Sequence, residues 1–282
     1  MLRLIGLGLS IYLLPIGNLV KLLRCNKILV DTYTSIWFSE GIDLFKMLNM
    51  DDIEVVYACR NDLEGKGIDV VVEEARSKDI CIATPGDPLI ATTHSAIVVE
   101  ALRKGVPVEV SPSSSILNVG ISMSCLQVYR FGRIATVVRP KNGIEYEHPL
   151  HIVKLNRVQD LHTMLLLEMD AENNYFMTPR EAIEVLLNIQ RRWGEEVIAL
   201  DDVIIVQQAI TSGKGRVYVE TVNRIVDSVT EFGEPPYTVI IPARKLHPIE
   251  RECLDNIEKI QCYTPSQYTD LHKLLERIHR LK

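Results

Sequence analysis

The sequence predicts an α/β protein of two α/β domains, with a five-stranded parallel sheet in the first domain and a mixed sheet in the second. Short apolar runs alternate with amphipathic runs in both halves of the chain, and a turn-rich segment at 111–115 separates the halves. Strands that alternate with helices pair in parallel through right-handed crossovers. We therefore expect an N-terminal domain over 1–112, a C-terminal domain over 113–262 and a separate final helix over 263–282.

The composition indicates an ordinary folded protein without a basic surface. Of the 282 residues, 47% are hydrophobic and 24% are charged, and the formal net charge is -6. A chain of this length can bury a substantial core. Nucleic-acid binding normally needs clustered positive charge, so we expect no nucleic-acid partner.

The leucine-rich N-terminus does not have the pattern of a signal peptide or a membrane span. The apolar run is interrupted by Gly6, Gly8, Ser10, Pro15 and Gly17. A signal peptide needs an unbroken apolar stretch and a small-residue cleavage site, and a membrane span needs about 18 or more apolar residues. We therefore expect no membrane association.

The cysteines are scattered along the chain. No CxxC pair occurs, and no cysteine lies at a short spacing from a histidine. Several cysteines lie inside apolar runs, as buried free thiols do. The pattern predicts free thiols, a reducing cytoplasmic location and no zinc site. The six residues are Cys25, Cys59, Cys81, Cys125, Cys253 and Cys262.

The first half is expected to contain five strands connected by helices. Each expected strand is a short apolar run. These runs cover 2–9, 27–31, 53–57, 79–83 and 106–110, and the expected helices cover 17–24, 40–49, 67–77 and 92–104. Continuous apolar strands are typical of a parallel sheet that helices cover on both faces.

The stretch ATPGDPLIATTH, residues 83–94, is the most distinctive loop of this half. It joins a buried strand to a helix and places a proline on each side of Gly86 and Asp87. Each proline fixes a backbone φ and removes a donor, and glycine reaches φ values closed to other residues. The spacing fits a tight βα turn and a stiff ligand-binding loop equally well, because open α/β sheets bind ligands at the carboxyl ends of their strands.

The second half is expected to contain four strands with helices between them. The strands cover 134–138, 163–168, 203–208 and 237–241, and the helices cover 116–123, 150–158, 179–193 and 221–229. A capping box begins the third of these helices, because Thr178 precedes Pro179 and Glu181 lies three residues after the threonine. The final helix has a basic polar face and is expected to dock on the protein or to face a partner.

The sequence contains no complete catalytic motif. Gly6 and Gly8 follow the first strand, but position 11 is isoleucine, so the third glycine of a dinucleotide fingerprint is missing. No P-loop, GxSxG elbow or HExxH spacing occurs. We therefore expect no triphosphate site, no serine hydrolase and no metal site, and we name no catalytic residue.

Three segments predict a ligand crevice between the two halves. GLGLS, residues 6–10, follows the first strand, PGDP, residues 85–88, follows the fourth, and the serine-rich turn opens the second half. Such a crevice is lined by backbone and small side chains and lacks the basic residues that bind phosphate. It suits a neutral or cationic small molecule that contains a ribose and a purine.

The order of these motifs resembles the diphthine synthase branch of the tetrapyrrole-methylase class of S-adenosylmethionine-dependent methyltransferases. The resemblance extends from Leu4 to about Glu252, and PGDPLxATTH together with QVYRFG and KLH is specific to this branch. Its motifs in this chain are GLGLS, ATPGDPLIATTH, Ser115-Ile116, LQVYRFG (126–132), TYTS (32–35), LHT (161–163), FMTP (176–179), FGEPP (232–236) and KLHPIE (245–250).

The resemblance implies a homodimeric enzyme that binds S-adenosyl-L-methionine in the crevice. It implies trimethylation of the amino group of a modified histidine on translation elongation factor 2. The cofactor contacts that the resemblance implies are Leu9, Asp87, Ile90, Ser115, Ile116, Leu167, Ala209, Thr211 and His247, with an ambiguous register over 209–211.

The chain departs from the family pattern at three places. IYLLPIGN replaces a polar stretch over 11–18, AITS replaces an Ala-Arg-x-Gly segment over 209–212, and Asp31 replaces a glutamate. Two other functions stay open, namely a tetrapyrrole C-methyltransferase of the same fold and a non-catalytic module that binds a translation partner. An apolar trough for a porphyrinoid would favour the first, and a failure to bind S-adenosylhomocysteine would favour the second.

Overall fold

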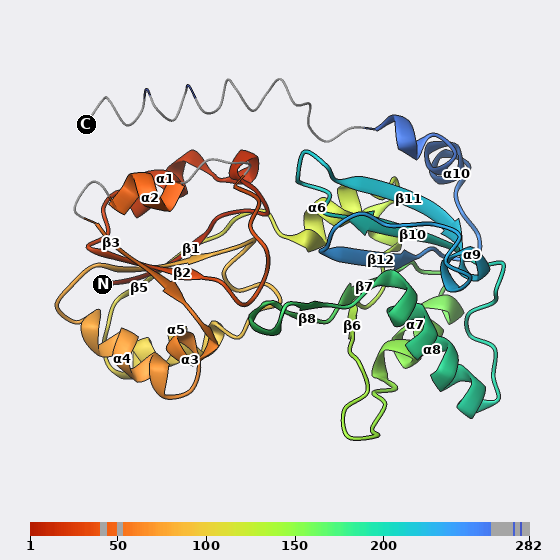
Figure 1. Cartoon of the computed structure of the whole chain (residues 1–282), viewed down its shortest axis with the longest axis horizontal. Helices are drawn as coiled ribbons and strands as arrows, with labels where there is room; N and C mark the ends of the chain where they lie inside the picture. The colour runs from red at the N-terminus through yellow and green to blue at the C-terminus, as the bar shows by residue number, and fades with distance from the viewer. Residues whose placement is uncertain (40–43, 50–52, 261–272, 274–276, 278–282) are drawn as a thin grey trace.

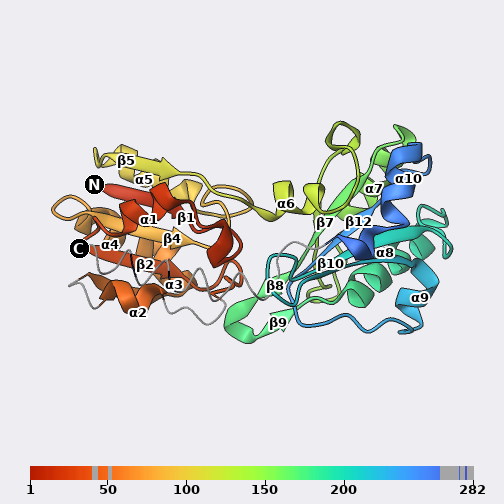
Figure 2. The same cartoon turned by 90° about the horizontal axis from the view of Figure 1, so that it is seen from above.

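The computed structural model describes residues 1–39, 44–49 and 53–260, together with Lys273 and Arg277. The described chain forms two lobes side by side, each built around a five-stranded sheet (Figures 1 and 2). The strands of the first sheet lie within residues 2–111, and those of the second lie within 135–241. The predicted α/β fold with two sheets is confirmed, and the domain limits at 112 and 262 stay a prediction.

The N-terminal lobe contains the parallel sheet that the sequence predicts. Its strand order is β3-β2-β4-β1-β5, and every neighbouring pair is parallel. All five residues of the central strand β4 are buried, as expected for a sheet covered on both faces. The strands are β1 (Leu2–Gly6), β2 (Lys27–Asp31), β3 (Glu54–Ala58), β4 (Ile80–Thr84) and β5 (Val108–Ser111).

Helices cover both faces of this sheet (Figure 1). Leu22 of the first helix packs with Ile28 in one apolar cluster, and Val72 of a helix on the opposite face packs with Ile82 in another. The helix expected over 40–49 is described only from residue 44, and its first four residues lie outside the described part. One face carries α1 (Ile16–Leu22) and α2 (Leu44–Asn49), and the other carries α3 (Arg60–Leu63), α4 (Lys66–Glu74) and α5 (Ser95–Arg103).

The C-terminal lobe contains a mixed sheet, as predicted. Its strand order is β11-β10-β12-β7-β6, in which β6 and β7 are parallel and the other pairs are antiparallel. The strands are β6 (Ala135–Val137), β7 (Thr163–Leu167), β10 (Val203–Gln208), β11 (Arg216–Thr221) and β12 (Tyr237–Ile241). One face is covered by α7 (His148–Val158), α8 (Pro179–Trp193) and α9 (Val222–Val226), and the other by α6 (Ile116–Ser122) and α10 (Pro248–Leu254).

The sequence did not predict one strand, one helix and one short hairpin of this lobe. These are helix α10 and strand β11, although the RVYVET of β11 alternates as a half-buried strand does. The hairpin of β8 (Met169–Asp170) and β9 (Tyr175–Phe176) is too short to give a periodic signal. This hairpin extends from the C-terminal lobe towards the N-terminal lobe, where Glu172 Oε1 accepts a hydrogen bond from Arg60 N at 3.0 Å (Figures 1 and 2).

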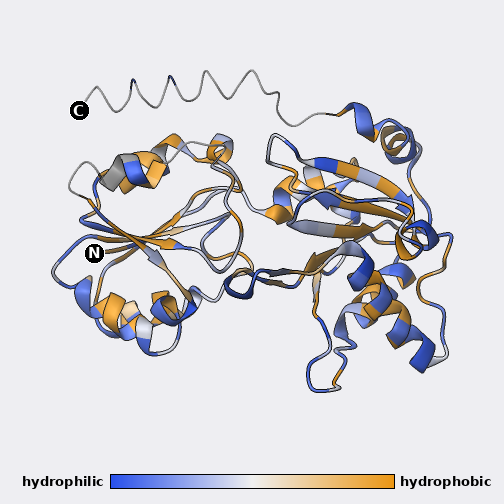
Figure 3. Ribbon diagram, in the orientation of Figure 1, coloured by the Kyte–Doolittle hydropathy of each residue, from blue (hydrophilic) through white to orange (hydrophobic). Residues whose placement is uncertain are grey.

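Two predicted helix starts are confirmed by their capping contacts. Thr178 Oγ1 accepts a hydrogen bond from Glu181 N at 3.2 Å, and Thr178 N donates to Glu181 Oε2 at 2.7 Å. Ser115 N donates to Asn118 Oδ1 at 2.7 Å at the start of α6. Figure 3 shows α8 striped with hydrophobic and hydrophilic residues, as expected for a helix that covers a sheet with one face.

The prediction that the cysteines are free thiols is wrong for four of them. Cys25 and Cys81 form a disulfide with a Cα–Cα distance of 6.0 Å, and Cys125 and Cys253 form a second one at 5.7 Å. The partners lie 56 and 128 residues apart in sequence, so no local spacing reveals them. The inference of a reducing compartment from free thiols therefore loses its basis.

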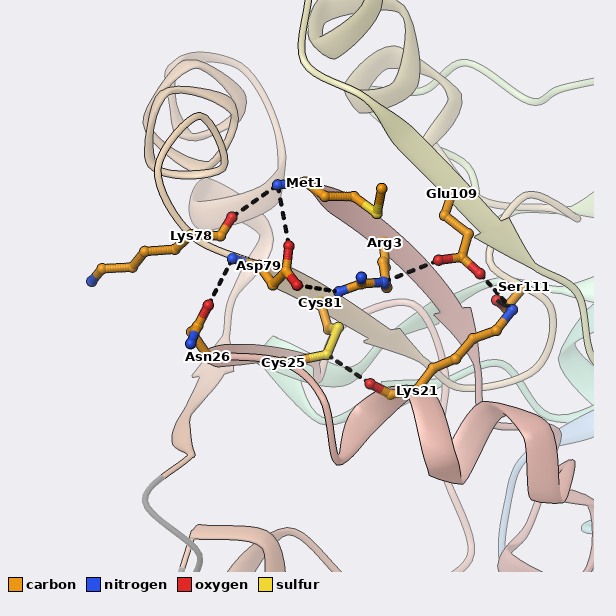
Figure 4. Close-up of a disulfide and its surroundings, with 10 residues drawn as sticks. All are labelled: Met1, Arg3, Lys21, Cys25, Asn26, Lys78, Asp79, Cys81, Glu109 and Ser111. Atoms are coloured by element: carbon orange, nitrogen blue, oxygen red, sulfur yellow. Dashed lines mark hydrogen bonds and ion pairs between the residues drawn. A yellow bond between two sulfur atoms is a disulfide. The ribbon is translucent and has the colours of Figure 1, made fainter.

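The first disulfide lies beside a network of charged side chains at the edge of the N-terminal lobe (Figure 4). Arg3 bridges two strands, since it lies 3.1 Å from Asp79 and 3.0 Å from Glu109. Lys21 of α1 also pairs with Glu109, at 2.7 Å. The disulfide and the ion pairs together fasten α1 and the first residues of the sheet strands to one another.

Two expected absences can be compared with the described residues. None of the described helices combines the length and the apolar character that a membrane crossing requires. No group of three or more potential metal ligands from His, Cys, Asp and Glu comes together within the described ranges. The expected final helix over 263–282 lies outside the described residues except at Lys273 and Arg277.

Candidate active site

A cavity of about 310 Å³ lies between the two lobes. On the N-terminal side it is lined by the loops that follow β1, β2 and β4, at the carboxyl ends of those strands, where open α/β sheets place their ligands. On the other side it is lined by the start of α6 and by ends of β6, β7, β10 and β12. Its described lining contains apolar, hydroxyl and two carboxylate side chains but no lysine, arginine or histidine.

Glycines allow the loop after β4 to touch the loop after β1. Gly86 N donates to Gly8 O at 2.8 Å, and Gly8 N donates to Gly86 O at 3.2 Å. Both residues have a positive φ, +69° at Gly8 and +79° at Gly86. A Cβ at Gly6 would lie 2.8 Å from Gly86 O, so a side chain there would push the loops apart. The Gly-x-Gly pair therefore brings two loops together and needs no third glycine.

Asp87 fastens the loop after β4 to the segment that joins the lobes. Its Oδ1 accepts a hydrogen bond from Leu89 N at 2.9 Å, and its Oδ2 accepts one from Ser113 N at 3.0 Å. The residue is buried, with 7% of its surface exposed. The loop is stiff because its own carboxylate satisfies two backbone donors.

His94 lies buried beneath the same loop. Its Nδ1 is 3.2 Å from Pro88 O and 3.3 Å from Thr84 Oγ1. Since a carbonyl oxygen only accepts, the contact with Pro88 places a proton on Nδ1. The other nitrogen, Nε2, lies 3.4 Å from Tyr33 Oη and 3.5 Å from Asp31 Oδ2. Burial lowers the pKa of His94 below its usual value, and the Asp31 carboxylate opposes this effect.

Asp31, at the end of β2, organises the second wall of the cavity. Its carboxylate accepts hydrogen bonds from Tyr33 N and Thr34 N, each at 3.1 Å, and from Thr34 Oγ1 at 2.5 Å. The loop that begins here contributes Thr34 and Ser35 to the cavity lining. Burial raises the pKa of the Tyr33 hydroxyl to about 12, so Tyr33 stays protonated beside Asp31 and His94.

A second buried polar cluster joins η2 (Val128–Arg130) to α10, and none of its residues lines the cavity. Glu250 accepts a hydrogen bond from Gln127 N at 3.0 Å and pairs with Arg130 Nη1 at 2.7 Å. His162 Nδ1 accepts from Ala243 N at 2.9 Å, so its Nε2 carries the proton and donates to Glu250 Oε1 at 3.1 Å. Burial raises the pKa of Glu250, but these bonds outweigh it and hold the pKa below its usual value. The motifs QVYRFG, LHT and KLHPIE therefore meet each other rather than the cavity.

Comparison with known proteins decides the family. A sequence profile of the tetrapyrrole (corrin/porphyrin) methylases matches residues 51–225. A protein named diphthine synthase from Staphylothermus marinus is 40% identical over 265 residues, which cover 92% of this chain and 93% of that protein. This chain belongs to the diphthine synthase family.

Further members agree with this assignment. A diphthine synthase from Methanopyrus kandleri is 37% identical over 260 residues, which cover 91% of this chain and 95% of that protein. A crystal structure of a diphthine synthase matches with a TM-score of 0.78 and 29% identity, over 94% of this chain and 97% of that chain. The predicted resemblance is confirmed, and the chain is a methyltransferase of the diphthine synthase family.

The structure brings together eight of the nine residues that the family resemblance selects. All eight line the cavity, three from the N-terminal lobe and five from Ser115 onward, and their role as cofactor contacts stays a prediction. They are Leu9, Asp87, Ile90, Ser115, Ile116, Leu167, Ala209 and Thr211.

His247 is the exception. It does not line the cavity and instead forms the N-cap of α10, where its Nδ1 accepts a hydrogen bond from Ile249 N at 3.3 Å. Its backbone N donates to the buried Glu250 at 2.9 Å. A histidine followed by proline and glutamate forms a capping box here, so the local sequence accounts for its position without a ligand.

Several lining residues of this diphthine synthase family member were not predicted. Thr34 and Ser35 belong to the motif TYTS, which gave a signal that was not assigned to the site. Glu168 directly follows Leu167 and also lines the cavity. Gln207 was expected only as part of a strand; its Nε2 donates to Gly120 O at 2.7 Å and supports the end of α6 beside the cavity.

Proposed function

We propose that this chain binds S-adenosyl-L-methionine in the cavity between the lobes and trimethylates the amino group of the modified histidine of translation elongation factor 2, in diphthamide biosynthesis. The observation that carries the proposal is the cavity itself, which collects eight family positions from both lobes in a chain of the diphthine synthase family. The acceptor is a translation factor, so the reaction is expected in the cytoplasm.

The chemistry of the lining supports a cofactor of this class. Asp87 is a carboxylate, and the described lining contains no cationic side chain. A phosphate-bearing cofactor would normally be held by basic residues, which the described lining lacks, whereas a sulfonium with an amino group carries positive charge. The apolar side chains of Ile90, Ile116 and Leu167 offer surface for a purine.

The protein assists the methyl transfer mainly by positioning the cofactor and the acceptor. S-adenosyl-L-methionine supplies a methyl group already activated by the positive charge on sulfur. The loop at Asp87 and the loop at Thr34 are each fixed by internal hydrogen bonds, so their lining atoms need little rearrangement when a ligand binds. When the methyl group and the acceptor nitrogen are held in line, much of the entropy cost of the displacement is met on binding, and the activation barrier is lower.

Mass spectrometry of elongation factor 2 tests the proposal. After incubation with this protein and S-adenosyl-L-methionine, three methyl groups should appear on the amino nitrogen of the modified histidine. Elongation factor 2 with an unmodified histidine is the control and should stay unmethylated. Calorimetry should show binding of S-adenosylhomocysteine, and the absence of binding at millimolar concentration would remove the cofactor assignment.

We infer that the active form is a homodimer. Val128 and Tyr129 of η2 are 54% and 94% exposed, and the nearby Ile249 is 67% exposed. The hydrogen bond from Gln127 N to Glu250 holds η2 beside α10, so these apolar side chains belong to one region of the C-terminal lobe. An obligate interface buries about 2,000 Å² or more and is rich in such residues.

Light scattering at low micromolar concentration tests the dimer. Tyr129→Glu should shift the wild-type dimer towards the monomer if this surface is the interface. A stable and active wild-type monomer of 32.0 kDa would contradict the inference.

A further inference from the structure

Two carboxylates line the described part of the cavity, and different groups hold them. Both oxygens of Asp87 accept hydrogen bonds from backbone N–H groups of nearby loops. Glu168 lies across the cavity, directly after the last residue of β7, with 10% of its side chain exposed. One oxygen of Glu168 is held by the backbone, and the other faces cationic side chains.

The contacts of Glu168 leave one oxygen for a cation. Its Oε2 accepts a hydrogen bond from Arg139 N at 2.7 Å, and its Oε1 lies 3.0 Å from Lys141 Nζ. Arg139 Nε is farther from Oε1, at 3.6 Å. The guanidinium has other partners, since its Cζ lies 3.9 Å from the ring centroid of Tyr175 and Nη2 lies 3.8 Å from Asp170 Oδ2. Oε1 is therefore bound chiefly by a primary ammonium.

The Lys141 ammonium can be replaced at small cost. Its side chain is 53% exposed, and its backbone forms a turn in which Lys141 N donates to Ile144 O at 3.1 Å. An ion pair with this exposure contributes little to stability, because water screens it. An acceptor amino group that enters the cavity carries the same NH₃⁺ group, and it pairs with Glu168 where less water screens the attraction. Lys141 thus marks a place where another primary ammonium can bind.

We propose that Glu168 is a catalytic residue that binds the acceptor ammonium through Oε1, in place of Lys141, and takes its proton. This inference rests on the proposed methyl transfer and adds the base that the sequence did not identify. The other titratable side chains of the lining are less suited to this role. Asp87 is occupied by the backbone, and the Tyr237 hydroxyl donates to Gly233 O and has a pKa that burial raises.

The transfer then proceeds with a balanced change of bonds and charge. The acceptor ammonium gives one proton to Glu168 and becomes a neutral amine. The nitrogen lone pair forms a bond to the methyl carbon of S-adenosyl-L-methionine, and the carbon–sulfur bond breaks with its electron pair left on sulfur. The products are a methylammonium, an uncharged thioether and a protonated Glu168, which releases its proton to water.

Glu168→Gln tests this role because it keeps the size of the side chain and removes its charge. Elongation factor 2 with the modified histidine should bind about ten-fold more weakly without cofactor. At neutral pH, kcat/KM for methyl transfer should fall by about 10²–10⁴-fold. The defect should shrink as the pH is raised, since the solvent then deprotonates the amine. Arg139 and Lys141 lie next to Glu168 Oε1, Asp170 pairs with Arg139, and Tyr175 packs against the Arg139 guanidinium, so these groups also influence the pH profile.

Three matched measurements make the test decisive. The Kd of Glu168→Gln for S-adenosylhomocysteine should change by less than about two-fold. Glu168→Asp, which retains a carboxylate, should keep part of the activity if the shorter variant folds. Lys141→Met should lower the KM for the acceptor by up to about five-fold, because a competing cation is removed.

The proposal and the function beneath it fail in different ways. The role of Glu168 is overturned if Glu168→Gln has the same kcat/KM as the wild type. It is also overturned if kcat/KM is lowered by the same factor at every pH. Loss of S-adenosylhomocysteine binding in Glu168→Gln also overturns it, because the residue then serves the cofactor. A wild-type protein that neither binds S-adenosylhomocysteine nor methylates elongation factor 2 removes the proposed function, and the role of Glu168 with it.

Discussion

At the residue scale, Asp87 both lines the cavity and fastens the loop after β4 to the segment that joins the lobes. Asp87→Ala should weaken S-adenosylhomocysteine binding roughly ten- to hundred-fold, since a hydrogen bond to an ionised group contributes about 1.5–3 kcal/mol. The residue joins loops and supports no core cluster. Each kcal/mol of lost stability should lower the melting temperature by only about 2–4 °C in a chain of this size.

Asp87→Asn is the matched variant for this prediction, because its single side-chain oxygen can still accept one of the two backbone hydrogen bonds. Its affinity, measured by calorimetry, should lie between those of the wild type and the alanine variant. If Asp87→Ala loses its melting transition while the affinity per folded molecule is unchanged, the residue serves only the fold.

His94 should make the stability of the fold depend on pH. Its pKa in the folded protein lies below the usual value of 6.5, so the unfolded chain binds more protons between the folded-state pKa and 6.5. The free energy of unfolding is fully retained above about pH 6.5 and falls as the pH decreases through this window. Urea unfolding at several pH values should show a weaker pH dependence in His94→Asn than in the wild type.

His162 also contributes to the pH dependence of the free energy of unfolding, so His94→Asn should remove only part of it. Burial also lowers the pKa of His162, although Glu250 opposes the shift, so the two histidines act in the same direction. A double variant at positions 94 and 162 should therefore have a flatter profile than either single variant. An unchanged slope in His94→Asn would contradict the prediction for His94.

The sequence identified cavity-lining residues that follow strands, and it missed those that depend on the lobe arrangement. Leu9 and Asp87 lie in loops after predicted strands, so their convergence followed from the parallel sheet. Glu168 lies at the end of a strand in the other sheet, and no local pattern shows that this end faces the first lobe. His247 adjoins proline and glutamate and caps α10 outside the cavity lining, and its role as a cofactor contact stays a prediction.

At the element scale, regular periodicity and caps decided which helices and strands were predicted. The five strands of the first sheet are buried runs with clear ends, and α8 has both an amphipathic pattern and a capping box. The short hairpin of β8 and β9 has only two residues in each strand, which is too few to show a periodic pattern. Its contact with the N-terminal lobe is a tertiary contact that the local sequence does not reveal. Hydrophobic periodicity does not predict such short elements.

The capping box of α8 gives a direct stability prediction. Thr178→Ala removes the acceptor for Glu181 N and should cost about 0.5–2 kcal/mol. Chemical denaturation should show this loss, and Thr178→Ser should retain most of the stability because it keeps the hydroxyl. Methyl-transfer activity per folded molecule should be unchanged, since Thr178 does not line the cavity. Equal stability of the alanine variant and the wild type would contradict the role of the cap.

At the scale of the whole molecule, the two-sheet architecture was predictable and the covalent cross-links were not. Alternating strands and helices required a layered α/β arrangement, whereas the pairing of cysteines 56 and 128 residues apart depends on tertiary structure. Cys25–Cys81 joins two segments of the N-terminal lobe, and Cys125–Cys253 joins two segments of the C-terminal lobe. No disulfide among the described residues crosses from one lobe to the other.

Because no described disulfide joins the lobes, we expect each lobe to unfold as a separate cooperative unit on heating. A cross-link within one lobe restricts only the unfolded states of that lobe, so heating can melt the two sheets at different temperatures. A ligand that fills the cavity touches both units and binds only when both are folded, which couples their transitions. Scanning calorimetry of the free protein should resolve two overlapping heat-capacity peaks, and saturating S-adenosylhomocysteine should merge them into one sharper peak at higher temperature. A single transition whose shape the ligand leaves unchanged would contradict this expectation. It would show that the lobes already unfold together and that the ligand stabilises the protein without coupling two transitions.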